Sequence, residues 1–174
     1  KMLFEVLRRF DRNDLAYRIV SQRDFPGYAY MIDHGATTLI ESWALTDQNS
    51  WNHPMFGSVS EWFYRGLAGI NPAEDAYGMN KLVFRMQPLA GLSHVMAAFS
   101  SVRGVVGSQW EKRDGMLRWT VRIPANTRAE VDVPANVDDK VSADGKPLSS
   151  ALWKDGYFRV PIVSGTHVFY VTTK

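Results

Sequence analysis

The stretch VVGSQWEKRDGMLRWTVRI, residues 105–123, decides the fold of the second half of this chain. Asp114-Gly115 at its centre is a dipeptide that favours the tight turn of a two-stranded hairpin. After this turn the apolar Leu117 and Trp119 alternate with polar residues, and such a period of two is typical of a strand with one buried face. The stretch therefore predicts an antiparallel hairpin that packs on a core.

Outward from this hairpin, the chain from about residue 78 onward shows short runs of the same period, separated by Gly, Pro, Asn and Asp. Six or more strands at this spacing indicate an antiparallel β-sandwich. Trp110, Trp119 and Trp153 are expected in its core. The other runs are KLVFRMQ, HVMAAFSS, RAEVDV and THVFYVTT, with further turns expected at 123–126 and 143–146.

Residues 1–70 follow the period of a helix instead. The first helix is MLFEVLRRF, and Asn13 is the expected N-cap of the second. A third helix is expected from Thr37 or Thr38. A fourth is expected from Asn52 or His53, just before Pro54, to about Gly69, with Trp62 on its core side.

The change of period predicts a two-part α+β protein, with a helical domain in residues 1–77 and a sandwich in residues 78–174. The helices do not make a tidy bundle, and they resemble the last turns of a larger helical assembly. A chain that starts inside a helix, on Lys1, is expected to be a piece of something longer. The apolar side chains expected to stay exposed are Met2, Leu3, Leu7, Phe10, Leu15 and Ile19.

The composition and charge of the chain exclude several kinds of partner and site. The net charge is +2 with a sequence pI near 8.9, and Lys and Arg are scattered, so no nucleic-acid partner is expected. No apolar run is long enough to span a bilayer, and no membrane association is expected. With no cysteine and four histidines without ligand spacing, no metal site is expected.

The stretch GATTLIESWALTDQNSWNHPMFGSVSEWFYRGL, residues 35–67, gathers a carboxylate, tryptophans and an Asn-His pair. Sugar-handling sites use this mixture, because carboxylates perform acid–base chemistry and indole faces stack on pyranose rings. Each residue also has a structural interpretation. Glu41 could close a capping box with Thr38. His53 could be a helix-entry residue without a binding role, and Trp43 could belong to the core.

Three segments carry a resemblance that covers nearly the whole chain. DLAYRIVSQRDFPGYAYMIDHGATTLIESW (14–43) and NHPMFGSVSEWFYRGLAGI (52–70) resemble the end of the catalytic (α/α)6 barrel of bacterial α-L-rhamnosidases of the inverting type. SVRGVVGSQWEKRDGMLRWTVRIPANTRAEVDVPA (101–135) resembles the β-sandwich that follows the barrel in those enzymes. The fold implied is the end of an (α/α)6 barrel followed by an antiparallel β-sandwich.

The resemblance implies a glycoside hydrolase that cleaves terminal α-L-rhamnosyl linkages with inversion and needs no cofactor. Glu41 takes the place of the family's general base, His53 that of a residue in the sugar subsite, and Trp43 is expected to line the pocket. Ser42 stands where the family usually has Arg. The implied partner is a rhamnose-containing glycoside, oligosaccharide or polysaccharide.

The family's general acid lies earlier in the barrel and is absent from this sequence. The 174-residue chain alone is therefore expected to be inactive and to self-associate through its exposed apolar helix faces. The alternative function is a non-catalytic carbohydrate-binding or structural C-terminal module of a glycosidase. Glu41 in an open concave pocket favours the first interpretation, and a helix-capping Glu41 on a solvated face favours the second.

Overall fold

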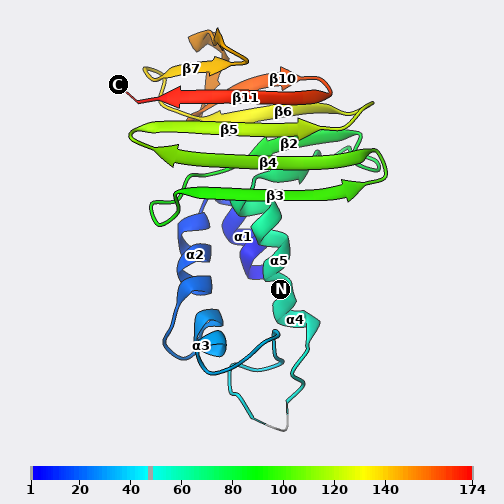
Figure 1. Ribbon diagram of the computed structural model, residues 1–174, viewed down its shortest axis with the longest axis vertical. Helices are drawn as coiled ribbons and strands as arrows, with labels where there is room; N and C mark the ends of the chain where they lie inside the picture. The colour runs from blue at the N-terminus through cyan, green and yellow to red at the C-terminus, as the bar shows by residue number, and fades with distance from the viewer. Residues whose placement is uncertain (1, 47–48, 174) are drawn as a thin grey trace. The chain divides into compact units, whose positions relative to one another are not determined.

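The structure, a computed structural model, describes residues 2–46 and 49–173 (Figure 1). The chain folds into two compact units, Lys1–Phe63 and Tyr64–Lys174. The first unit holds helices and the second holds strands, so the predicted combination of a helical end and a β-sandwich is confirmed. The division lies earlier along the chain than the boundary expected after residue 77, because strand β1 (Ile70–Pro72) already pairs with β2 (Lys81–Arg85).

The helices of the first unit are short. In α1, Phe4 is buried, while Glu5 forms ion pairs with Arg8 and Arg9. None of the helices in the described part of the chain has the length and apolar character needed to cross a membrane. These helices are α1 (Met2–Arg9), α2 (Asn13–Ser21), α3 (Tyr28–Asp33), α4 (Pro54–Gly57) and α5 (Val59–Trp62). The π-helical turn η1 (Phe63–Leu67) begins at the last residue of this unit and continues into the second, which also holds the 3-10 turn η2 (Ser150–Leu152).

The apolar surface of the first two helices is partly open. Met2, Leu3 and Phe10 are exposed, and Phe10 keeps 75% of its surface in contact with solvent. The other three side chains expected to be exposed, Leu7, Leu15 and Ile19, are half-buried.

The expected helix from Thr37 or Thr38 is wrong. Residues 37–46 contain only bends and backbone without regular structure, and the third helix, α3, lies earlier in the chain. Two adjacent threonines, Ile40 and Trp43 all have modest helix propensity, because branched and aromatic side chains lose rotamer freedom in a helix. The backbone groups of this stretch pair with residues 50–53 instead.

The second unit is a sandwich of two sheets. Its five-stranded sheet has the order β1-β2-β6-β10-β9, and its six-stranded sheet has the order β3-β4-β5-β11-β7-β8. Figure 1 shows β3, β4, β5 and β11 side by side in the second sheet. The remaining strands are β3 (His94–Ser101), β4 (Gly104–Arg113), β5 (Met116–Ile123), β6 (Arg128–Pro134), β7 (Lys140–Ala143), β8 (Lys146–Pro147), β9 (Trp153–Lys154), β10 (Tyr157–Ile162) and β11 (Gly165–Thr172).

One strand pair departs from the antiparallel pattern. β2 and β6 are parallel, with Leu82 opposite Ala129 and Phe84 opposite Val131. Between them the chain runs through β3, β4 and β5 of the other sheet. Such a long crossover is what a parallel pair requires, and strand periodicity alone does not reveal it.

Three hairpins of the sandwich turn on Asp-Gly pairs. Asp114-Gly115, Asp144-Gly145 and Asp155-Gly156 each have positive φ at both residues, from 49° to 86°. This backbone matches a type I′ turn, whose twist fits the strands on either side. The predicted turns at Asp114-Gly115 and at 143–146 are confirmed.

The core of the sandwich is organised around two tryptophans. Trp110 and Trp119 have no exposed surface, as predicted. The Nε1 of Trp119 donates to Ser108 Oγ at 2.9 Å, and the Nε1 of Trp110 donates to the Leu67 carbonyl at 2.8 Å, so both polar atoms are satisfied. Trp153 differs from the prediction, because the residue stays 36% exposed while its Nε1 donates to a backbone carbonyl.

Candidate active site

The candidate site lies on a loop whose two sides pair through their backbones. Glu41 N donates to Ser50 O at 2.9 Å, and His53 N donates to Leu39 O at 2.8 Å. The hydroxyl of Thr38 donates to the carbonyl of Trp51. These bonds bring the segments 38–41 and 50–53 side by side, although they are separated by about ten residues of sequence.

Glu41 is exposed, and its carboxylate is oriented by the opposite side of the loop. Ser50 N donates to Glu41 Oε2 at 3.0 Å, so the pair Glu41–Ser50 is joined by a backbone bond and by a side-chain bond. No helix begins at Thr38, and the capping-box interpretation of Thr38 and Glu41 is therefore wrong. Sequence reasoning missed Ser50, because a serine in a polar loop carries no signal of its own.

Trp43 lies in a group of aromatic rings. Its ring centroid is 5.1 Å from that of Tyr28 in an edge-to-face arrangement and 4.3 Å from that of Phe56. Burial raises the pKa of the Tyr28 phenol to about 12, so this residue stays neutral, and its hydroxyl donates to the Phe56 carbonyl at 3.4 Å. The half-buried Trp43 therefore joins the Glu41 loop to α3 and α4.

His53 precedes Pro54, the first residue of α4, and occupies the N-cap position with extended backbone. Its side chain makes no capping hydrogen bond. The ring is half-buried, and in the described ranges 2–46 and 49–173 no hydrogen bond to it is seen. Asn52, the other residue expected to begin this helix, lies one residue earlier and is exposed.

The structure thus brings the segments of Glu41 and His53 together and packs Trp43 against α3 and α4. Among the described residues, no group of three or more His, Cys, Asp or Glu side chains is arranged to hold a metal ion. An exposed carboxylate of fixed orientation can accept a proton, and a histidine on the paired segment can bind hydroxyl groups.

Two family models match consecutive parts of the chain. Residues 1–67 match the bacterial alpha-L-rhamnosidase 6 hairpin glycosidase domain, and residues 69–147 match the bacterial alpha-L-rhamnosidase C-terminal domain. Together with the helical unit and the sandwich, these matches define the class of protein. The chain is the end of a helical glycosidase domain joined to a β domain. The chain belongs to the bacterial α-L-rhamnosidase family and corresponds to the C-terminal portion of its members.

Individual relatives agree with this assignment. The α-L-rhamnosidase of Streptomyces avermitilis is 36% identical over 178 residues, which cover 97% of this chain and 17% of the relative. The crystal structure of the Streptomyces avermitilis α-L-rhamnosidase complexed with L-rhamnose has a TM-score of 0.85 at 35% identity, over 98% of this chain and 17% of that one. The structure of α-L-rhamnosidase from Dictyoglumus thermophilum has a TM-score of 0.89 at 33% identity, over 98% and 20%.

The match covers only a small part of each relative. The chain spans 17% of the length of the first curated relatives. The activity of those enzymes therefore belongs to polypeptides much longer than the matched segment.

Proposed function

We propose that this chain supplies the general-base side of the active site of an α-L-rhamnosidase that hydrolyses terminal α-L-rhamnosyl linkages with inversion. The proposal rests on the exposed Glu41 carboxylate, held at Oε2 by Ser50 N within a segment that matches the glycosidase domain. The complex of the Streptomyces avermitilis relative with L-rhamnose supports rhamnose-containing glycosides, oligosaccharides or polysaccharides as substrates.

In the proposed reaction Glu41 accepts a proton from a water molecule while the water oxygen attacks the anomeric carbon. The bond from that carbon to the glycosidic oxygen breaks, and the departing oxygen takes a proton from a carboxylic acid on the other side of the sugar. In inverting enzymes these two groups stand roughly 6.5–9.5 Å apart, which leaves room for the water. The hydrogen bond from Ser50 N keeps the Glu41 carboxylate in one orientation for this transfer.

His53 is proposed to bind a hydroxyl of the sugar. Its half-buried ring lies at the start of α4, on the segment that pairs with the Glu41 side of the loop. In the full-length polypeptide His53→Ala should lower kcat/KM without making activity sensitive to a metal chelator. If added zinc restored the activity of the His53→Ala variant, that result would contradict a substrate-binding role.

Trp43 is proposed to line the same pocket with the part of its indole that is not covered by Tyr28 and Phe56. Because Trp43 packs against these two rings and against the cluster of Met31, Ala36 and Ile40, its main effect is on the position of the loop. A substitution of Trp43 should therefore change both substrate binding and turnover.

The test of the proposal is Glu41→Gln in the full-length polypeptide that carries this segment. Glutamine keeps an oxygen that can accept the hydrogen bond from Ser50 N, so the loop should persist, but an amide cannot take the proton from water. We expect kcat on an aryl α-L-rhamnoside to fall by roughly 10²–10⁴-fold. The wild-type enzyme should release β-L-rhamnose first, as read by proton NMR, since inversion converts the α anomer to the β anomer.

The matched control is Glu74→Gln, which changes an exposed glutamate in a turn of the second unit. Its kcat should equal that of the wild type. Near wild-type turnover of Glu41→Gln, together with a loss in Glu41→Ala, would reduce Glu41 to a loop-stabilising residue. That result would favour the alternative, a structural or carbohydrate-binding module without chemistry of its own.

A further inference from the structure

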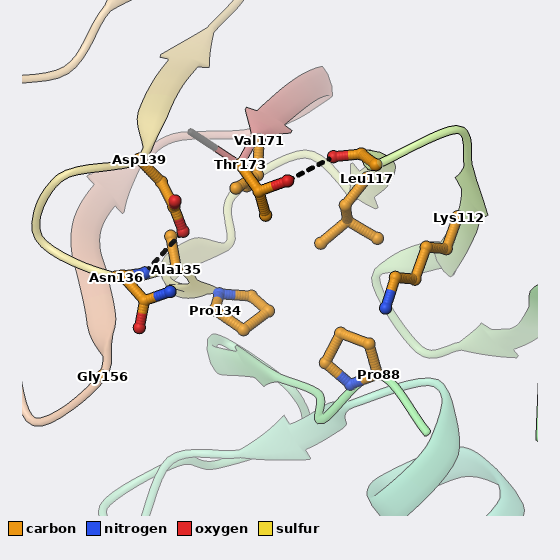
Figure 2. Close-up of a pocket in the computed structure, with 11 residues that line it drawn as sticks. Pro88, Lys112, Leu117, Pro134, Ala135, Asn136, Asp139, Gly156, Val171 and Thr173 are labelled. Atoms are coloured by element: carbon orange, nitrogen blue, oxygen red, sulfur yellow. Dashed lines mark hydrogen bonds between the residues drawn. The ribbon is translucent and has the colours of Figure 1, made fainter. Parts of the chain in front are cut away.

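A pocket of about 280 Å³ opens in the β-sandwich unit, where strands of both sheets contribute to its walls (Figure 2). Leu117 and Val171 come from the six-stranded sheet, and Pro134 comes from the five-stranded one. The volume lies just below the range of about 300–1,000 Å³ for small-molecule sites, and it suits a ligand of one ring.

The floor of this pocket is apolar. Leu117 and Val171 are buried core residues, and Figure 2 shows Leu117, Pro134 and Pro88 around one open space. Branched aliphatic and proline side chains present C–H groups without hydrogen-bonding atoms. Such a floor favours the C–H face of a ligand ring over a free ion.

Two polar side chains beside this floor, Asp139 and Thr173, are held by hydrogen bonds to their neighbours. Asp139 Oδ2 accepts from Asn136 N at 2.7 Å, and the hydroxyl of Thr173 donates to Gly115 O at 3.2 Å. These bonds leave Asp139 Oδ1 and the lone pairs of the Thr173 hydroxyl as acceptors. Both residues line the pocket.

Lys112 supplies the donor. Its backbone N donates to Ser93 O at 2.7 Å, which fixes the start of the side chain. Figure 2 shows its amine extending into the space between Leu117 and Pro88. Within the part of the chain that the structure describes, no protein acceptor is seen for this amine.

We propose that this pocket binds one neutral pyranose unit, as a site separate from the Glu41 loop. An apolar floor fits the C–H face of a sugar, while an ammonium donor and a carboxylate acceptor on the rim fit its hydroxyls. An anion would meet Asp139, and a cation would meet Lys112, so a neutral polyol uses both groups without repulsion. The proposal does not require Glu41 to be a general base.

The test is a titration of the 174-residue chain with L-rhamnose, followed by ¹H–¹⁵N NMR spectra. Gly115 and Gly156 line the pocket and have backbone amides that report on binding. We expect saturable shifts of these two amides and of Thr173, with a Kd in the millimolar range. D-glucose, sodium acetate and glycine are titrated in parallel as a second neutral sugar, an anion and a zwitterion.

Two variants test the polar rim. Lys112→Met and Asp139→Asn should each weaken binding by about tenfold, the effect of losing one charged hydrogen-bond partner. Asp139→Asn keeps an oxygen for Asn136 N, so the turn should persist. The matched control Lys154→Met, at an exposed lysine outside the pocket, should bind as the wild type does.

Three results would overturn the proposal: no saturable shift with either sugar, shifts with acetate or glycine but with neither sugar, or wild-type affinity in Lys112→Met. All of these readouts are independent of turnover. Wild-type turnover of Glu41→Gln would therefore not argue against this sugar site. The absence of binding in the titration would not argue against Glu41 as the general base.

Discussion

The indole Nε1 of Trp62 donates a buried hydrogen bond of 2.8 Å to Asn13 Oδ1, across 49 residues of sequence. Asn13 is the first residue of α2 and Trp62 the last of α5, so the bond joins the second helix to the last helix of the unit. Both residues are buried, and Phe4 packs on Trp62 with ring centroids 5.7 Å apart. The bond satisfies the polar atom of a tryptophan that otherwise lies in an apolar core.

Asn13→Ala should destabilise the helical unit. The variant leaves the indole N–H of Trp62 buried without its acceptor, at a cost of about 1–3 kcal/mol in the free energy of unfolding. Urea denaturation followed by circular dichroism measures this change. Asn52→Ala, at an exposed asparagine of the same unit, is the control and should be neutral. Equal stabilities of Asn13→Ala and wild type would show that solvent replaces the bond.

Trp43→Ala should loosen the loop that carries Glu41. The change removes the ring contacts to Tyr28 and Phe56 that join this loop to α3 and α4. Chymotrypsin should then cleave faster at the exposed Trp51, as mapped by mass spectrometry. Trp43→Phe keeps a ring and should show a smaller effect, and Trp153→Ala in the sandwich should show none. An unchanged cleavage rate in Trp43→Ala would argue against an anchoring role.

The isolated chain should not hydrolyse an aryl α-L-rhamnoside and should self-associate. An inverting site needs two carboxylates across the bond, and only Glu41 is proposed here. Exposed Met2, Leu3 and Phe10 favour association, so sedimentation velocity should show dimers or larger species. Leu3→Ser with Phe10→Ser should reduce them, whereas Met96→Ser on β3 should not. Turnover that Glu41→Gln abolishes in this chain would mean that a complete site is present.

Asp144 should make the sandwich sensitive to acid. The hydrogen bond from His167 Nδ1, at 2.8 Å, and that from Val168 N lower the pKa of Asp144 below its ordinary 3.8. A carboxyl whose pKa is lower in the folded state stabilises the fold above its unfolded pKa, and this contribution disappears as the pH falls through the folded pKa. The free energy of unfolding should therefore decrease below about pH 4.

The measurement is urea denaturation between neutral pH and acid pH. Asp144→Asn should flatten the decrease, because the amide does not titrate. Asp155→Asn is a close control, since Asp155 begins another Asp-Gly turn with φ of 51° against 49° at Asp144. An identical pH dependence in Asp144→Asn and wild type would assign the acid sensitivity to other groups.

Asp132→Asn should destabilise the five-stranded sheet. Asp132 is buried on β6 between Arg85 of β2 and Arg159 of β10, with N–O distances of 3.1 and 3.5 Å. Removing its charge takes the buried counter-ion from both guanidinium groups, at a cost of about 3 kcal/mol, the lower end of the range because both arginines reach solvent. Chemical denaturation measures this value, and the exposed Asp138→Asn should be neutral. A loss below about 0.5 kcal/mol in Asp132→Asn would contradict the prediction.

The features that could be predicted from the sequence are local. The turn at Asp114-Gly115 needs only two residues that accept positive φ, and the alternation through Leu117 and Trp119 needs only a strand with one buried face. The family resemblance came from contiguous motifs, and the two family models confirm it. Such a motif also indicated the residues of the candidate site, although the roles of Glu41, His53 and Trp43 stay predictions.

Only the tertiary structure decided which hydrogen-bond partner each polar group has. Asn13 has the sequence signature of an N-cap, but its side chain bonds the buried Trp62. Thr38 and Glu41 have the spacing of a capping box, but residues 50–53 supply their hydrogen-bond partners and no helix forms. The sequence determined strands, turns and family, because these depend on neighbouring residues. Only the folded chain decided these pairs, because segments distant in sequence compete for the same buried or backbone polar groups.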